Sequence, residues 1–152
     1  MRKILSFILT VLALSACSQA SDIPFEEVRN YFLRNDAVIP SSPMIDSSEQ
    51  FESLFGAAAF MGKDGQPTPV DFGKEFIIAV IPPVTDTLTR LDPESLRTAG
   101  KELVLTYRET VGETQSWTMQ PLLLVKVDRK YLKDSVRLEK KLSQAAQGRT
   151  GL

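Results

Sequence analysis

The hydrophobic pattern of this 152-residue chain changes period about halfway along. In the first half, Phe25, Val28 and Phe32 recur at spacings of three and four, which would place them on one face of a helix. From residue 76 onward, continuous apolar runs and alternating segments are typical of strands. The pattern predicts an α+β protein, with two short N-terminal helices packed on an antiparallel sheet of about four to five strands.

The two helices are expected at residues 22–34 and 46–55. Asp22 can cap the first helix. The second begins with Asp46-Ser47-Ser48-Glu49, which resembles a capping box with the aspartate in the cap position. Gly56 is a suitable residue for ending it.

The strands are expected in the second half of the chain. Residues 76–81 are apolar on both faces, as in a central strand, and residues 85–91 and 103–108 alternate. The last long strand is expected over 117–127, with Trp117, Met119, Leu123, Val125 and Val127 on one face. Breaks are expected at Asp92-Pro93, at 99–101 and at a hairpin over 111–113, with Pro121 at an edge or bulge. Residues 128–145 fit either a helix or a turn followed by a strand.

The N-terminus has the order of a secretory signal. Arg2 and Lys3 precede an apolar run over 4–14, which ends in small residues and a cysteine. The run is too short to span a bilayer, which needs about 20 residues. This N-terminus could be an ordinary secretory signal with an incidental cysteine, a membrane span, or the signal of a lipoprotein.

Leu14-Ser15-Ala16-Cys17 resembles the lipobox of bacterial lipoproteins. The resemblance implies cleavage before Cys17 and acyl chains on its sulfur and amine, and several chains together give a stable anchor. Ser18 is not the aspartate associated with inner-membrane retention, so the expected location is the outer membrane, facing the periplasm. The expected organisation is a signal peptide over 1–16, a lipidated cysteine and tether over 17–22, a single α+β domain over 23–143 and a frayed tail over 144–152.

Composition removes several classes of function. The chain has no histidine and one cysteine, which excludes Ser-His-Asp and Cys-His catalysis and the common zinc sites. Loss of the signal leaves 16 basic and 19 acidic residues, and no basic stripe that would favour nucleic acid. No phosphate-binding or dinucleotide-binding motif is present. We therefore expect no catalysis, no metal and no cofactor beyond the lipid on Cys17, and an enzyme with a carboxylate pair or a Ser-Lys pair is the least supported class.

Two features are candidates for binding a partner. Thr85, Thr87 and Thr89 form a row on one face of an expected strand and can present hydroxyl groups. Trp117 is the only tryptophan, and exposed tryptophans are frequent at interface hot spots. The simpler interpretation is that the threonines suit an exposed strand and that Trp117 packs in the core.

A longer segment carries a second resemblance. Val70-Asp71-Phe72-Gly73-Lys74 leads into a strand, and Gln120-Pro121 leads into another that ends in valine and lysine. Residues 70–128 thereby resemble the C-terminal domain of a protease-complex subunit family of bacterial envelopes. That family follows its first strand with a glycine-rich turn, where this chain has Pro82-Pro83-Val84-Thr85-Asp86-Thr87.

These observations indicate a lipid-anchored, non-catalytic envelope protein that binds another protein. The resemblance implies a modulator or inhibitor of an envelope protease or complex. The alternative is a small-ligand-binding sensor or carrier lipoprotein. The oligomeric state stays open at this stage.

Overall fold

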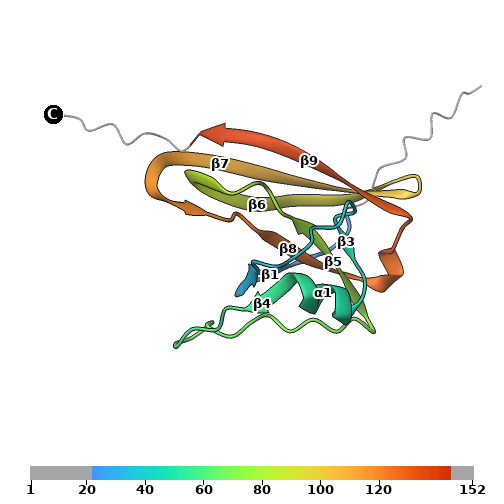
Figure 1. Ribbon diagram of the computed structural model, residues 1–152. Coiled ribbons are helices and arrows are strands. Elements are labelled where there is room, and N and C mark those ends of the chain that lie inside the picture. Colours follow the sequence, from blue (N-terminus) through green and yellow to red (C-terminus); the bar gives the residue numbers. More distant parts are fainter. Residues whose placement is uncertain (1–21, 145–152) are drawn as a thin grey trace, which may run out of the picture.

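Three β-sheets and one short helix make up the computed structural model, which describes residues 22–144 (Figure 1). The elements in chain order are β1 (Glu26–Val28), β2 (Tyr31–Leu33), β3 (Met44–Ile45), α1 (Ser48–Leu54), β4 (Phe55–Ala57), β5 (Glu75–Val80), β6 (Thr85–Ala99), β7 (Glu102–Met119), β8 (Leu123–Asp128), a 3₁₀ turn (Arg129–Tyr131) and β9 (Ser135–Gln144). Within these residues, no helix has the length and apolar character needed to cross a membrane.

The central layer is a four-stranded antiparallel sheet in the order β1-β8-β5-β3. Strand β5 is buried on both faces. Phe76, Ile78 and Val80 pack towards the three-stranded sheet, and Ile77 and Ala79 pack towards α1. The run of apolar residues therefore predicted the central strand correctly, because a strand covered on both sides needs apolar residues at every position.

A longer sheet in the order β6-β7-β9 covers one face of the central layer. Strands β6 and β7 form a hairpin that turns at Gly100, whose φ of 62° suits glycine. Leu96, Leu103 and Leu105 are fully buried between the two sheets. Strand β9 runs parallel to β7, so this sheet is mixed and not antiparallel as expected.

The other face of the central sheet is covered by α1 and by the two-stranded β2–β4 sheet. Phe51 of α1 lies at its centre, with ring centroids 5.0 Å from Tyr31, 5.1 Å from Phe55 and 5.5 Å from Phe72. The helix over 46–55 was predicted correctly. Ser47 caps it, however, by accepting a hydrogen bond from the Gln50 amide, so the expected cap at Asp46 is wrong.

The predicted helix at 22–34 is wrong, and so is the predicted α+β class with two helices on one sheet. Residues 22–144 form mostly strands, in three sheets, with α1 as their one α-helix. The 22–34 segment forms β1 and β2, separated by Asn30 in the left-handed region with a φ of 64°. Val28 is buried against the α1 side, whereas Phe32 is 51% exposed. The apolar residues therefore do not share one face, and pairing of β1 with β8 determines the local structure.

Several strand boundaries also differ from those expected. Strand β6 continues through Asp92-Pro93, because a register shift between Pro93 and Ser95 accommodates the proline. Strand β7 continues through the hairpin expected at 111–113, and the chain leaves it only after Met119. The strand expected over 117–127 is thus the end of β7 followed by β8, and 128–145 takes the alternative of a turn followed by a strand.

The described chain begins at the closed end of the β6–β7 hairpin. Asp22 forms an isolated bridge with Arg97, and the Ile23 amide donates to the Leu96 carbonyl at 2.7 Å. The open end of the hairpin lies at the opposite end of the molecule (Figure 1). Arg97 and Thr85 are separated along β6 by up to about 40 Å of extended chain.

Candidate functional site: the open end of the long hairpin

The open end of the β6–β7 hairpin carries an irregular bulge. Thr87 pairs with Thr114, and Thr85 pairs with Met119, so β6 advances two residues while β7 advances five. The extra residues of β7, 115–118, have no partner in β6. Bulges of this kind redirect side chains that regular alternation would place elsewhere.

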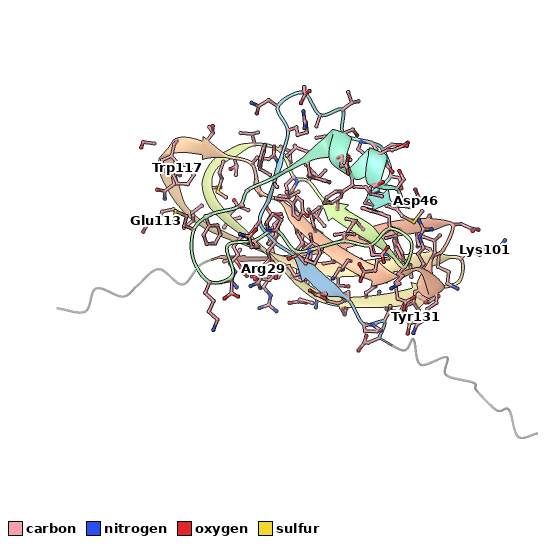
Figure 2. All side chains as sticks on the ribbon, turned by 90° about the horizontal axis from the view of Figure 1, so that it is seen from below. Arg29, Asp46, Lys101, Glu113, Trp117 and Tyr131 are labelled. Atoms are coloured by element: carbon pink, nitrogen blue, oxygen red, sulfur yellow. The ribbon has the colours of Figure 1, made fainter. Side chains whose placement is uncertain are left out.

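Trp117 lies on this bulge and is 52% exposed. The expectation that it packs in the core is therefore wrong. The prediction that Trp117 shares a face with Val127 assumes one regular strand over 117–127. That assumption fails, because β7 and β8 are separate strands and the bulge interrupts β7. Figure 2 shows Trp117 and Glu113 at one end of the molecule and Lys101 at the other.

Threonines of β6 lie opposite the bulge and bond to one another. The hydroxyl oxygens of Thr85 and Thr87 are 2.8 Å apart, and those of Thr87 and Thr89 are 3.2 Å apart. The Thr89 hydroxyl also donates to the Thr87 carbonyl, and Thr89 is buried. The row exists as the sequence indicated, but its hydroxyls form a ladder that supports this end of β6.

Further apolar side chains are exposed at the same end of the hairpin. Val84 is 60% exposed and Leu88 is 52% exposed. Leu88 lies over Gly112 of β7, where an added Cβ atom would be 3.4 Å from the Leu88 Cβ and 3.2 Å from its carbonyl oxygen. Glycine at this position therefore lets β6 and β7 approach closely beneath Leu88.

A hollow of about 420 Å³ lies beside the bulge, between the end of β7 and the β1–β2 segment. Arg29 and Arg90 line it. Arg29 pairs with Glu27 at 2.9 Å, and Arg90 pairs with Asp92 at 2.8 Å. The hydrogen bond and charge of Glu27 raise the pKa of Arg29. Both guanidinium groups are thus neutralised by neighbours and do not form a free anion site.

A second hollow of about 400 Å³ shares Glu27 and Arg29 with the first and extends to the 58–68 loop. Asn30 holds this loop, because its amide donates to the Asp64 and Gln66 carbonyls at 2.8 Å each. At the tip of the loop Phe60 is 57% exposed and Met61 fully exposed. The apolar run at 57–61 is the only sequence signal for this tip, and it does not indicate exposure.

The open end of the hairpin combines the exposed side chains of Trp117, Val84 and Leu88 with a row of threonine hydroxyls. Among residues 22–144, no three or more cysteine, aspartate or glutamate side chains gather where they could hold a metal ion. At this end the threonine hydroxyls bond to one another, and Arg29 and Arg90 pair with neighbouring carboxylates. Cys17, the predicted lipidation site, lies outside the described residues.

No family model matches the chain, and neither the curated proteins nor the solved structures include a significant match.

Proposed function

We propose that this protein is a lipid-anchored, non-catalytic module of the bacterial envelope that binds another protein through the open end of its long hairpin. The exposure of Trp117 on the 115–118 bulge carries the proposal. Tryptophan contributes more binding energy at interfaces than most residues, because a large apolar surface is removed from water. A bulge supplies such a side chain at a fixed position without unfolding the strand.

The position of the bulge supports this proposal. An anchor at Cys17 would be five residues from Asp22, within about 18 Å of it when fully extended. Asp22 pairs with the closed end of the hairpin, so the bulge would be at the far end from the membrane. A surface at that end is accessible to a partner in the periplasm.

Co-purification tests this proposal in cells that produce the full chain with a C-terminal affinity tag. Envelopes are crosslinked, dissolved in mild detergent and compared for the wild type, Trp117→Ala and Val38→Ala. Val38 is the matched control, because it is 86% exposed and lies beside Arg34, Glu52 and Ser53 rather than on the hairpin. We expect one partner with the wild type and the control, and at least about tenfold less of it with Trp117→Ala. Equal recovery with all three proteins would contradict the proposal.

A narrower form of the proposal makes the partner an envelope protease or its complex, as the resemblance of residues 70–128 implies. The strands that follow the two matching segments, β5 and β8, are antiparallel neighbours and pair over six residues. Addition of the purified Cys17→Ser protein in molar excess should then change the rate at which envelope proteases cleave their substrates. Unchanged cleavage rates would exclude an envelope protease as the partner, without contradicting the proposal that the protein binds another protein.

A small-ligand carrier is the alternative, and the hollows beside Arg29 would be its binding place. Their volumes fall within the range of ligand sites, but such sites are usually lined by apolar groups with a few convergent polar atoms. Here the polar groups are paired with each other, which favours the protein-binding proposal. A ligand would raise the melting temperature of the protein, because it binds only the native state.

A further inference from the structure

Strand β9 is an outer strand with a regular and accessible edge. It pairs with β7 over ten residues without a register shift and contains no proline or glycine. No other strand within residues 22–144 pairs with its second edge. The opposite outer strand, β6, has Pro93, three register shifts and a bridge to Asp22. Of the two, β9 is the edge suited to pairing with another chain.

The charges of β9 are neutralised within its own sheet. Lys140 pairs with Glu109 at 2.9 Å, and Lys141 pairs with Glu94 at 2.7 Å. Arg137 pairs with Glu139 at 2.6 Å. Lysines on an outer strand usually prevent pairing with other chains, because they would be brought together or desolvated. Here the neighbouring carboxylates remove most of that repulsion.

Two leucines on the inward face of β9, Leu138 and Leu142, differ in their surroundings: Leu142 is exposed, whereas Leu138 lines an apolar hollow. Leu142 is 71% exposed. Leu138 is half-buried and lines a hollow of about 160 Å³ together with Ile39, Pro40, Pro43, Ile45, Ala79 and Ile81. A cavity of about 150 Å³ accommodates a group the size of benzene, so this hollow can accept a leucine side chain. Leu142 cannot fill it in the same chain, because it lies further along β9.

We infer that β9 pairs antiparallel with β9 of a second copy of this chain, with the two-fold axis at Lys140. This register places Leu142 of one copy opposite Leu138 of the other, at the apolar hollow. On the other face it places Glu139 opposite Lys141, twice by symmetry. The two three-stranded sheets then form one continuous six-stranded sheet across the dimer.

The neighbouring registers are less favourable. Side chains keep to their own face only when the register moves by two residues. An axis at Glu139 would place that carboxylate opposite its own copy and Arg137 opposite Lys141. An axis at Lys141 would place Leu142 opposite Lys140. Like charges directly opposite each other destabilise a strand pair. The axis at Lys140 also places one like charge opposite its own copy, but Glu109 of the same chain pairs with Lys140 at 2.9 Å and offsets it. This axis alone combines two Glu139–Lys141 pairs with two Leu138–Leu142 pairs, so it is preferred.

A cysteine at position 140 tests this register in the full chain. Only an axis at Lys140 brings the residue opposite itself, where directly opposed Cβ atoms are about 4.5–5.5 Å apart. We expect mild oxidation to convert most of the Lys140→Cys protein to a disulfide-linked dimer. One control is the wild type, whose only cysteine is Cys17. The other is Lys130→Cys, because the Lys130 side chain is 64% exposed and lies on the 3₁₀ turn, outside the proposed pairing of β9 with β9. Dimer formation no greater than in Lys130→Cys would overturn the inference.

A second variant keeps the inference testable if Lys140→Cys folds poorly. Leu142→Glu replaces an exposed side chain and should leave the monomer stable, but it places a charge against the apolar hollow of the partner. Two copies with different C-terminal tags are co-expressed and co-purified. We expect recovery of the second copy to fall at least about tenfold for Leu142→Glu and to be unchanged for Val38→Glu. Equal recovery for wild type and Leu142→Glu would overturn the inference, and neither result depends on Trp117.

Discussion

At the scale of single residues, Asn30 combines two roles at the turn between β1 and β2. Its φ of 64° lies in a region that few side chains adopt, and its amide holds the 58–68 loop. We expect Asn30→Gly to lower the free energy of unfolding by about 1 kcal/mol, because it loses the two hydrogen bonds. Asn30→Ala should lose about 1 kcal/mol more, because alanine is strained in the left-handed region. Urea unfolding measures both values, and equal losses would contradict the backbone role.

Glu139 gives the outer face of the β6-β7-β9 sheet a dependence on pH. Arg137 and Arg97 donate hydrogen bonds to its carboxylate and hold its pKa below the usual value of 4.5. A carboxyl group whose pKa is lower in the folded state stabilises the protein above its unfolded pKa, and this contribution is lost as the pH falls through the folded pKa. The free energy of unfolding should therefore decrease as the pH falls below about 4.5.

The variant Glu139→Gln separates this effect from general acid denaturation, because the amide has the same shape and no titrating charge. We expect its unfolding free energy to change less than that of the wild type between about pH 5 and about pH 3. Chemical denaturation at several pH values makes the comparison. Parallel curves for the two proteins would show that Glu139 does not contribute.

The candidate site shows what alternation can predict at this scale. The threonine row was visible in the sequence, because residues two apart in a strand share a face. The exposure of Trp117 was not visible, because it depends on a bulge created by pairing with a strand thirty residues away. A single sequence records no such register shift.

At the scale of elements, the cap of α1 provides a direct test. Ser47 accepts the Gln50 amide hydrogen bond at 3.3 Å, while Asp46 contributes its backbone carbonyl to Arg129. Ser47→Ala should lower the free energy of unfolding by about 1 kcal/mol, because the first turn loses its cap. Asp46→Ala should change it much less, since the carbonyl is kept. If Asp46→Ala lowers the free energy of unfolding more than Ser47→Ala does, in thermal or urea unfolding, then Asp46 is the cap, as the sequence predicted.

Elements with an uninterrupted local pattern were predicted better than those interrupted by a bulge or a proline. Strand β5 was evident because residues 76–80 are all apolar, and α1 was evident from its polar start and its apolar face. The first segment failed because β1 and β2 have three residues each, too few to show a strand period. The parallel pairing of β9 with β7 could not be read from the sequence, because alternation is the same in parallel and antiparallel strands.

At the scale of the whole molecule, the proposed place of the protein in the envelope depends on attachment through Cys17. We expect the mature protein to begin at Cys17, to carry the mass of the acyl chains and to sediment with the outer membrane. Cys17→Ser should move to the soluble envelope fraction, because several acyl chains provide the anchor. Mass spectrometry of the N-terminal peptide and membrane fractionation check this. Membrane association of Cys17→Ser equal to wild type would exclude the lipid anchor.

Site-specific photocrosslinking in growing cells shows whether a partner protein contacts the bulge around Trp117. A photoreactive amino acid is placed at position 117 on the bulge or at position 130, which lies on a 3₁₀ turn away from it. We expect one discrete adduct with another envelope protein from position 117 and none of that mass from position 130. The absence of an adduct from position 117, or the same adduct from both positions, would contradict binding through the open end of the hairpin.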